Sequence, residues 1–396
     1  MLVTNRPKES AAVEKDVHSS CAPLEILPVR GEDERRRFLH LPWSLYADDP
    51  AWVPPLLLER KEHLSKRNPY FLHANFQSWI ARRGNETVGR ISVQVDRLHL
   101  QRYDDRTGFF GLIEGQDDPE VFQALFGAAQ TWLREQGMCR VRGPFNLSIN
   151  EECGLLVEGF DTPPMIMMGH ALPYYSGRIE ELGFTGAQEL LAYRIRADFA
   201  APRHLDALIS RLGERVRLRP LRRRQFAEDL AIIKDIFEDA WSNNWGFLPF
   251  TTEEFAQMGK NLKLLVPPDF VRIAEVDGEP AAMMVVFPNL NEAIRDLDGR
   301  LLPLGWLKVL WRLKVSGVKT GRVPLMGVRR RFQGSRLGAT LALMLITSLQ
   351  TSARGRGMED VEMSWILESN RGMCNIIESL GGERYKRYRI YQKNLD

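Results

Sequence analysis

One stretch of the sequence combines residue types that bind phosphate with a spacing that would present them together. Residues 323–346, VPLMGVRRRFQGSRLGATLALMLI, read as an apolar strand, a basic corner that contains glycine, and a long apolar helix. Glycine lets the backbone approach an anion closely, and the first turn of a helix presents N–H groups that lack partners. The corner is therefore predicted to bind phosphate, and a plain tight turn is the alternative.

The distribution of charge agrees with an anionic ligand at this corner. The chain of 396 residues carries a formal net charge of only +3, which does not predict a nucleic-acid-binding protein. Between residues 295 and 336, however, eleven Lys or Arg residues stand against two acidic ones. Arg329, Arg330 and Arg331 precede the corner and Arg336 lies within it, so charge-assisted hydrogen bonds to phosphate are expected.

The cysteines and the hydropathy pattern favour a cytoplasmic protein. Four cysteines are spread along the chain without a C-x-x-C pair or a metal-site spacing, so we expect reduced thiols and no metal. Residues 1–23 are polar, which predicts a disordered tail and not a signal peptide. No apolar run of about 18 residues occurs, so no spanning helix is predicted, although a helix could still lie on the inner membrane.

Hydrophobic periodicity, caps and turn residues predict the elements that position the corner. Residues 270–288 predict a hairpin that turns at Asp277-Gly278, and residues 251–265 predict a helix with a threonine cap and acids in its first turn. A strand is predicted over 323–328 and a helix over 337–353. The corner should therefore connect a strand directly to a long helix.

The first half of the sequence repeats this order of elements. Asp118 and Pro119 begin a predicted helix that Gly137 ends, and a Gly-Asn turn joins two earlier strands. Both halves close with a helix, Leu-Gly and a strand, as in IEELGF…AQELLAYRIR and IESLGGERYKRYRIY. The sequence therefore predicts two copies of one α/β unit that join near residues 196–211.

The order strand, helix, helix, three strands, helix, strand, helix, strand resembles the fold of the Gcn5-related N-acetyltransferase (GNAT) superfamily. The resemblance implies tandem α/β domains, each a twisted, mostly antiparallel mixed sheet flanked by helices. Residues 24–200 would form a domain without a coenzyme A motif. The loop that corresponds there to the basic corner, in GLIEGQDDPEVFQAL, is acidic. Residues 212–396 would form the domain with the acyl-CoA site, interrupted by an amphipathic insertion at 289–320.

The superfamily marks its coenzyme A site with Q/R-x-x-G-x-G/A between its fourth strand and third helix. Gln333 and Gly338 fit this motif, whereas Arg336 stands where the family prefers glycine. The resemblance also implies that a backbone N–H of the preceding strand polarises the thioester carbonyl. The implied coenzyme-binding residues are Met326, Gly327, Val328, Arg329, Gln333, Gly334, Ser335, Arg336, Leu337, Gly338, Ala339 and Asn370.

Three longer segments are similar to a double-domain acyltransferase branch, some members of which act as bacterial ceramide synthase. They are GPFNLSINEECGLLVEGFDTPPMIMM, NNWGFLPFT and YKRYRIYQKNL. The similarity implies transfer of a fatty acyl group from acyl-CoA, as co-substrate, to the amine of a sphingoid base, with no permanently bound cofactor. An acetyltransferase acting on a small amine or peptide, or a non-catalytic acyl-CoA-binding protein, is the alternative.

The residues for proton transfer are less well specified by the sequence. Ile377 stands where the family often has a general-acid tyrosine, so Tyr385 or Tyr388 of the last strand is the candidate acid, with Tyr385 taken first. No histidine follows His204, which makes Glu368 a candidate base. Glu152 and His170 would serve if the first half contributes. A structural role is the alternative for each of these side chains.

The acceptor head group is expected to bind at a polar cluster. The insertion is expected to contact lipid. In the insertion, Lys308 and Arg312 share one helical face and Trp306 lies opposite, a composition typical of helices at a membrane interface. Packing of that helix on its own protein is the alternative. The candidate substrate-binding residues are Asn146, Ser148, Asn150, Tyr174, Asn243, Asn244, Trp245, Trp306 and Trp311.

Overall fold

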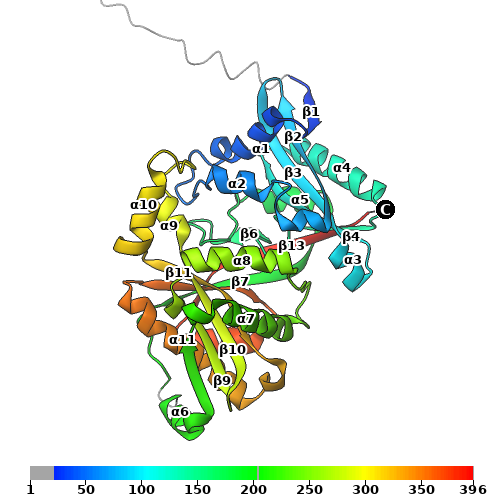
Figure 1. The fold of residues 1–396 in the computed structure, drawn as a ribbon. Coiled ribbons are helices and arrows are strands. Elements are labelled where there is room, and N and C mark those ends of the chain that lie inside the picture. Colours follow the sequence, from blue (N-terminus) through cyan, green and yellow to red (C-terminus); the bar gives the residue numbers. More distant parts are fainter. Residues whose placement is uncertain (1–21, 203–204, 396) are drawn as a thin grey trace, which may run out of the picture.

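The computed structural model describes residues 22–202 and 205–395, so the tail predicted over residues 1–23 lies outside the described residues except for its last two positions. One continuous 13-stranded sheet runs through the molecule (Figure 1). Its strands are β1 (Leu24–Pro28), β2 (Ala74–Arg83), β3 (Glu86–Asp96), β4 (Thr107–Gly115), β5 (Arg140–Gly143), β6 (Leu155–Glu158), β7 (Thr185–Arg196), β8 (Val216–Pro220), β9 (Val271–Val276), β10 (Glu279–Pro288), β11 (Thr320–Val328), β12 (Asp360–Leu367) and β13 (Glu383–Asn394).

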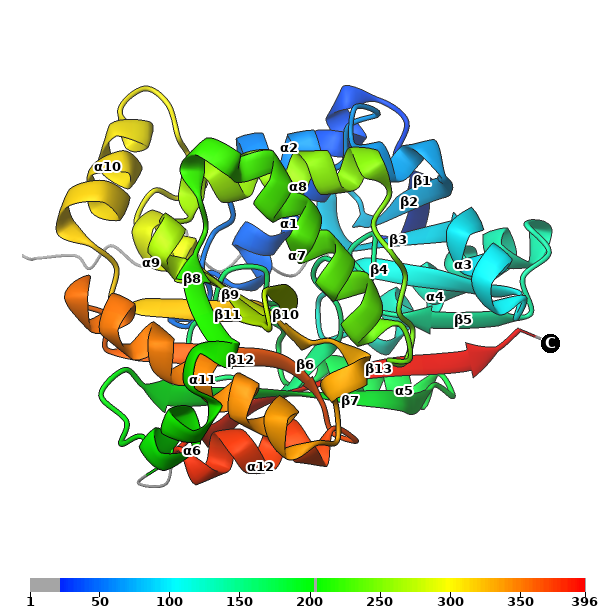
Figure 2. The ribbon, with the colours of Figure 1, turned by 60° about the horizontal axis from the view of Figure 1, so that its bottom comes forward.

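Helices flank the sheet, as expected for an α/β fold. In the second half, α7 and α8 lie on one side of the strands and α11 and α12 on the other (Figure 2). The α-helices are α1 (Glu32–Leu45), α2 (Leu57–His63), α3 (Arg97–Tyr103), α4 (Pro119–Glu135), α5 (Tyr175–Glu181), α6 (Leu205–Leu212), α7 (Phe226–Trp241), α8 (Thr252–Leu265), α9 (Leu290–Ile294), α10 (Gly305–Trp311), α11 (Arg336–Gly355) and α12 (Arg371–Ser379).

The last strand of each half lies beside strands of the other half. The order along the sheet is β1-β2-β3-β4-β5-β13-β7-β12-β11-β10-β9-β8, and β6 pairs with β13 off this path. β7 ends the first half in sequence but pairs with β12, whereas β13 ends the second half but pairs with β5. β7 and β13 also pair with each other. The two halves therefore complete each other's sheets.

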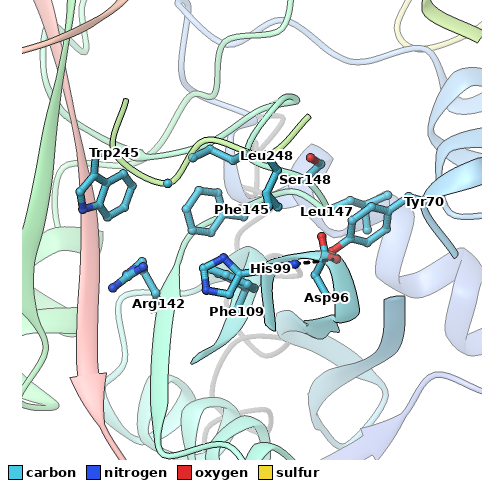
Figure 3. Close-up of a pocket in the computed structure, with 12 residues that line it drawn as sticks. Tyr70, Asp96, His99, Phe109, Arg142, Phe145, Leu147, Ser148, Trp245 and Leu248 are labelled. Atoms are coloured by element: carbon cyan, nitrogen blue, oxygen red, sulfur yellow. Dashed lines mark hydrogen bonds between the residues drawn. The ribbon is translucent and has the colours of Figure 1, made fainter. Parts of the chain in front are cut away.

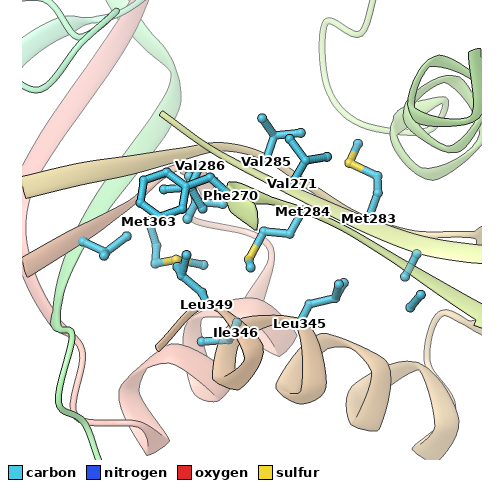
Figure 4. Close-up of a cluster of buried hydrophobic side chains, with 14 of the residues drawn as sticks. Phe270, Val271, Met283, Met284, Val285, Val286, Leu345, Ile346, Leu349 and Met363 are labelled. Atoms are coloured by element: carbon cyan, nitrogen blue, oxygen red, sulfur yellow. The ribbon is translucent and has the colours of Figure 1, made fainter. Parts of the chain in front are cut away.

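Two large cores hold the helices against the sheet. In the second half, Leu345 and Leu349 of α11 pack against Met284 of β10 and neighbouring buried side chains (Figure 4). In the first half, Leu125 of α4 is buried in the same way with Ile91 of β3. Burial of a leucine side chain contributes roughly 1.5–3 kcal/mol, so these buried leucines hold α11 and α4 on the sheet.

The predicted caps and turns are confirmed in the described chain. The Asp118 side chain caps α4, and Thr251 forms a capping box at the start of α8. Asp277 and Gly278 both have positive φ angles, 52° and 84°, in the turn between β9 and β10, which suits a tight hairpin. The insertion at 289–320 is less regular than expected, since it consists of α9, α10 and a π-helical turn over Arg312–Ser316.

Candidate functional site

β11 and β12 begin side by side and then separate. Their parallel pairing runs from Thr320↔Asp360 to Val323↔Met363 and ends there, although both strands continue. On the other side of β11, the register with β10 shifts between Val285 and Phe287. We call the continuation in which these two strands no longer pair with each other, residues 324–328 of β11 and 364–367 of β12, the β11–β12 fork. Here β11 stays paired with β10 and β12 with β7, so only the edges that face each other lack a neighbouring strand, beside the basic corner.

The corner itself turns tightly from β11 into α11. Gly334 has a φ of 68°, a conformation that L-amino acids with side chains rarely adopt. The Ser335 hydroxyl accepts a hydrogen bond of 3.0 Å from the Gly338 N–H and so caps α11. A Cβ at Gly338 would lie 2.1 Å from the Phe332 carbonyl oxygen. Glycine at both positions therefore fixes the path of the backbone at the start of the helix.

The polar side chains of the corner divide into those with protein partners and those without. Gln333 donates hydrogen bonds to the carbonyls of Val328 and Ala240, which attaches the corner to the end of α7. Arg329 forms an ion pair with an aspartate of α7, and Arg330 forms another at 3.3 Å. Arg331 and Arg336 are exposed and have no acidic partner within residues 22–202 and 205–395.

The remaining residues of the implied coenzyme set lie around the same fork. Met326, Gly327 and Val328 end β11, and Leu337 and Ala339 lie in the first turn of α11. A Cβ at Gly327 would lie 2.3 Å from the Trp241 ring, so α7 packs closely on this strand. Asn370 follows β12 and caps α12 by accepting a hydrogen bond from the Met373 N–H.

The equivalent strands of the first half separate in the same way but are filled. β4 and β5 pair only over Thr107–Phe109 and Arg140–Arg142. Beyond them, the Phe145 N–H donates to the Phe110 carbonyl at 2.7 Å, and the Asn146 side chain accepts from the Leu112 N–H at 2.8 Å. A Cβ at Gly111 would lie 1.9 Å from the Phe145 oxygen. Residues 143–148, which we call the plug, therefore occupy this position.

Glu152 and His170 interact with first-half residues. Although burial would raise the pKa of the Glu152 carboxyl, the Arg60 guanidinium and a hydrogen bond from Asn146 lower that pKa to about 2. The His170 Nε2 lies 2.7 Å from the Asp49 carboxylate, and burial lowers the pKa of His170. These contacts give both side chains a stabilising role in the first half.

The two second-half candidates differ in their surroundings. Glu368 follows β12 and is half-buried, with its carboxylate 3.8 Å from the Arg387 guanidinium. The Tyr385 hydroxyl donates a hydrogen bond to the carboxylate of Glu362, and burial is the main cause that raises the pKa of this phenol. Glu362 is 0% exposed. Tyr385 therefore connects to a buried acid that sequence analysis did not select.

Glu362 belongs to a buried polar cluster at the start of the fork. The Ser364 hydroxyl donates to one carboxylate oxygen at 2.5 Å, and Arg322, 1% exposed, lies 3.6 Å from the same oxygen. The signal in the sequence was a charged residue inside each of two apolar strands, which requires a buried partner. The pairing could not be deduced because it depends on the register of β11 and β12.

Residues from both halves meet at a pocket beside the plug (Figure 3). The Asn150 side chain donates to the Leu248 carbonyl at 3.0 Å, and Gly246 lies against Ile149. Ser148 and Trp245 both line the pocket. The structure therefore brings together the two loops, 146–150 and 243–248, that carry most of the predicted substrate residues.

The other predicted substrate residues lie apart from this pocket lining. The Asn146 side chain is used within the plug, and the Tyr174 hydroxyl donates to the Gly115 carbonyl. Asn243 and Asn244 precede Trp245 in the loop after α7, where the Asn244 N–H donates to the Trp241 carbonyl. Only the loop, and not a contact with the pocket, connects these two asparagines to the site.

The insertion exposes an apolar surface. Trp306 is 46% and Trp311 56% exposed, and the side chains of Leu302, Leu304, Leu307, Leu310 and Val315 are exposed as well. Lys308 and Arg312 share a face, as predicted, because both form ion pairs with Asp296. We call residues 302–315 the apolar insertion surface.

The described residues contain neither a membrane-spanning helix nor a cluster of metal-binding side chains. Within residues 22–202 and 205–395, no helix is both long and apolar enough to span a bilayer. In the same ranges, no three or more His, Cys, Asp or Glu side chains gather in a way that could hold a metal ion.

Comparison with known proteins gave two close relatives. No protein-family model matches the chain. The chain is 51% identical over 365 residues to "Protein YghO" of Escherichia coli (strain K12), in an alignment that covers 92% of this chain and 94% of that protein. It is 46% identical over 380 residues to "Bacterial ceramide synthase" of Caulobacter vibrioides (strain NA1000 / CB15N), which covers 95% of this chain and 99% of that protein.

A solved structure shares the fold over nearly the whole chain. It is a tandem GNAT protein from the clavulanic acid biosynthesis pathway, with a TM-score of 0.56 and 14% identity, covering 94% of this chain and 99% of that one. At this level of identity the similarity concerns the fold alone. It confirms the predicted architecture of tandem GNAT-like units with mixed, mostly antiparallel strands.

Proposed function

The chain belongs to the family of double-domain GNAT N-acyltransferases that includes bacterial ceramide synthase, and we propose that it transfers a fatty acyl group from acyl-CoA to the amine of a sphingoid base. The named relative and the shared fold support N-acyl transfer, and we infer acyl-CoA as the co-substrate. The lipid acceptor follows from the relative named as a ceramide synthase.

The open β11–β12 fork beside the arginine-flanked corner is the observation that carries the proposal. A pantetheine arm is narrow and carries amide groups, so unpaired strand edges can bind it as a further strand would. The N–H groups of the first turn of α11 and the guanidinium groups of Arg331 and Arg336 would bind the diphosphate. In the first half the plug fills the equivalent position, which supports a single coenzyme site in the second half.

The proposed coenzyme residues have two kinds of role. Gly327, Gly334 and Gly338 allow the close backbone path, while Gln333 holds the corner on α7. Arg336, which replaces a family glycine, adds a side-chain contact to phosphate because it is exposed and without an acidic partner in the described chain. A backbone N–H of residues 326–328 would polarise the thioester carbonyl.

The reaction needs a neutral amine next to the thioester and a proton for the departing sulfur. Holding both substrates in one site supplies much of the rate, because it removes the entropy cost of their encounter. The loops 146–150 and 243–248 are proposed to contact the amino-alcohol head group. Each buried methylene contributes about 0.8 kcal/mol, so a sixteen-carbon acyl chain gains on the order of 10 kcal/mol over acetyl.

We further propose that the apolar insertion surface docks on an anionic membrane, on which lipid substrates reside. Two exposed tryptophans beside basic side chains suit the interface between headgroups and acyl chains. The first half holds this segment in place, since the Arg295 guanidinium donates to the Pro50 carbonyl and the Leu57 N–H to the Gly299 carbonyl. The surface is therefore rigidly attached to the enzyme.

Product analysis tests the proposed reaction. The protein is incubated with acetyl-, octanoyl- and palmitoyl-CoA together with sphinganine and a panel of short amines, and the amides are identified by mass spectrometry. The expected main product is N-palmitoyl sphinganine. Faster turnover of acetyl-CoA with every amine would reject the lipid assignment while leaving an N-acyltransferase.

Vesicle binding tests the membrane contact separately. Co-sedimentation with phosphatidylglycerol vesicles is expected to fall about tenfold or more in a Trp306→Ala, Trp311→Ala variant. Leu72→Ala, which removes another exposed apolar side chain, is the matched control and should bind as the unchanged protein does. Equal binding of both variants would reject the assigned surface.

A further inference from the structure

The buried cluster at the start of the β11–β12 fork suggests how a proton moves during acyl transfer. We propose that Tyr385 and Glu362 form a relay in which the tyrosine hydroxyl contacts the acceptor amine and the buried carboxylate receives the proton through it. This inference rests on the proposed N-acyl transfer and adds Glu362 to the residues considered for it.

The position of Glu362 follows from the strand register. Glu362 faces Arg322 in the pairing of β11 with β12, and the pairing ends one residue later at Val323 and Met363. The carboxylate therefore lies at the closed end of the fork, next to the unpaired edges at which the thioester is placed. Glu368, just beyond the far end of β12, is half-buried and lies outside this pairing.

Tyr385 connects this buried acid with a more accessible position. It comes from β13, two strands away from β12, and its ring lies beneath the Arg194 guanidinium of the intervening strand β7. Its hydroxyl donates to one carboxylate oxygen of Glu362, while Ser364 donates to the other. Tyr385 is half-buried, whereas Glu362 is fully buried, so the phenol is the more accessible of the two groups, and the proposed proton path runs through it.

Two cations, Arg322 and Lys386, lie beside the carboxylate and also bind backbone carbonyls of the first half. Arg322 donates at 3.0 Å to the Ile166 carbonyl and at 2.8 Å to the Ser364 hydroxyl, and its closest approach to Glu362 is 3.6 Å. Lys386 donates to the carbonyls of Gly159 and Thr162. Both cations thus hold first-half residues 159–167 over the cluster. That cover keeps water from the carboxylate, which strengthens its interaction with a proton donor.

Two donors of the cluster have no partner. The Tyr388 hydroxyl, on a side chain 0% exposed, and the buried Trp365 indole N–H have no hydrogen-bond partner in the described residues. The Trp365 ring stacks beneath the Arg322 guanidinium at 4.7 Å, so it lies in the same cluster. Since buried donors in proteins are nearly always paired, the cluster is less completely hydrogen-bonded than an ordinary core.

The proton balance of the relay is closed. As the neutral amine nitrogen bonds to the thioester carbon, its N–H proton passes to the Tyr385 oxygen while the tyrosine proton passes to Glu362. When the C–S bond breaks, Glu362 returns a proton to Tyr385 and the tyrosine proton goes to the departing sulfur. The amide and the free thiol are formed, one proton has moved from nitrogen to sulfur, and both side chains regain their initial state.

Steady-state kinetics with palmitoyl-CoA and sphinganine test the relay. Tyr385→Phe and Glu362→Gln are each expected to lower kcat by about 100- to 1,000-fold, with the KM for palmitoyl-CoA changed by less than about threefold. Because both act on one proton path, the double variant should be no slower than the slower single variant. Glu362→Asp, which keeps the acid, should recover part of the loss.

Asp229→Asn is the matched control for removal of a buried carboxylate. Asp229 is 0% exposed and paired with Arg219 and Arg222 at a distance from the fork, so its variant should lose stability but keep kcat. If Glu362→Gln does not fold, Tyr385→Phe decides alone, since it removes one oxygen from a partly buried ring.

The outcomes separate the relay from the proposed reaction. Normal kcat in Tyr385→Phe would overturn the relay, as would multiplicative losses in the double variant, and amide formation by the unchanged protein would still establish N-acyl transfer. Absence of any amide from the unchanged protein, with palmitoyl-CoA binding intact, would instead reject the proposed reaction and the relay with it.

Discussion

The two parallel strand pairs of the sheet, β4–β5 and β11–β12, begin alike and end differently. Each pairs over three or four residues and then separates. The plug closes the first pair by donating to β4 and accepting from it, whereas the pairing of β11 with β12 is not replaced by another strand in the described chain. One architecture thus yields a filled strand pair in one half and, in the other half, the edge at which we propose that coenzyme A binds.

The surroundings of the two strand pairs differ in charge as well. Asp118 before α4 and Glu120 in its first turn are paired with Arg83. Arg331 before α11 and Arg336 at its first position have no acidic partners in the part of the chain that the structure describes. A diphosphate would be repelled at the first loop and attracted at the second. Shape and charge therefore select the same half.

Charge reversal at the basic corner between β11 and α11 should have the largest effect of the changes that test this difference between the halves. Arg331→Glu with Arg336→Glu is expected to weaken palmitoyl-CoA binding by about 100- to 1,000-fold, because each charge-assisted hydrogen bond contributes roughly 1.5–3 kcal/mol. Isothermal titration at fixed salt measures the affinity. Arg223→Glu with Arg224→Glu, an equal charge change at the other end of α7, serves as the control. Unchanged affinity in the first variant would place the phosphates elsewhere.

Crowding the plug should destabilise the first half without affecting the coenzyme. Gly111→Ala puts a methyl group 1.9 Å from the Phe145 oxygen, and we expect a loss of about 2–3 kcal/mol in the free energy of unfolding. Urea denaturation measures it, and palmitoyl-CoA affinity should stay within twofold. Gly127→Ala, where α4 has open space around the new Cβ, should be neutral or stabilising by up to about 1 kcal/mol. Equal behaviour of the two variants would mean that the plug is loosely packed.

A histidine that bridges the halves should make their association dependent on pH. The His73 ring lies 3.0 Å from Asp96 of the first half and 3.1 Å from Glu254 of the second. Burial would lower the pKa of His73, but hydrogen bonds to the two carboxylates raise that pKa to about 9. Since the folded pKa lies above the usual 6.5, this stabilisation is complete below pH 6.5 and is lost as the pH rises through 9.

Substitution of this histidine gives the measurable consequence. His73→Gln is expected to lower the free energy of unfolding by on the order of 2 kcal/mol at pH 6, a value reduced for the partial exposure of the site to solvent. The loss should be much smaller at pH 10, because the imidazole is then neutral in the folded protein as well. Thermal unfolding at both pH values measures the difference. A loss independent of pH would show that the charge of His73 contributes little.

The smallest effect is expected within the corner itself. Arg330 is already paired with Asp239, and its backbone N–H donates to the same carboxylate at 2.8 Å. Arg330→Ala should therefore weaken palmitoyl-CoA binding by less than about threefold, since an exposed ion pair contributes at most about 1 kcal/mol. A loss comparable to that at Arg331 and Arg336 would show that Arg330 leaves its partner to bind phosphate.

Local features of the site were predictable from short stretches of sequence. The strand, corner and helix around Gln333 follow from hydrophobic periodicity and glycine, and Ser335 moves the start of α11 only one residue before its predicted position. The acidic loop before α4 predicts that no second anion site exists there, and this stays a prediction. The apolar insertion was recognisable from Trp306 and Trp311, although its division into short helices was not.

The residues of the buried cluster were not predictable in the same way. Arg322 and Glu362 come together because β11 pairs with β12, and Tyr385 reaches them from β13 across β7. Separations of 23 to 63 residues connect these side chains, and no local periodicity specifies which of them meet. Tyr385 was selected by sequence, but its partner Glu362 was visible only once the strands were assembled.

The sequence by itself determined the elements, their repeated order, the basic corner with its glycines and the tryptophans of the insertion, because caps, turns and periodicity act within a few residues. The tertiary structure decided that the last strands of the halves exchange places and that the plug fills the gap between β4 and β5, whereas no strand lies between the separated ends of β11 and β12 in the described chain. It also decided that a buried acid lies behind Tyr385. These outcomes depend on strand register and on contacts between distant segments, and the free energy of such packing is a property of the whole fold.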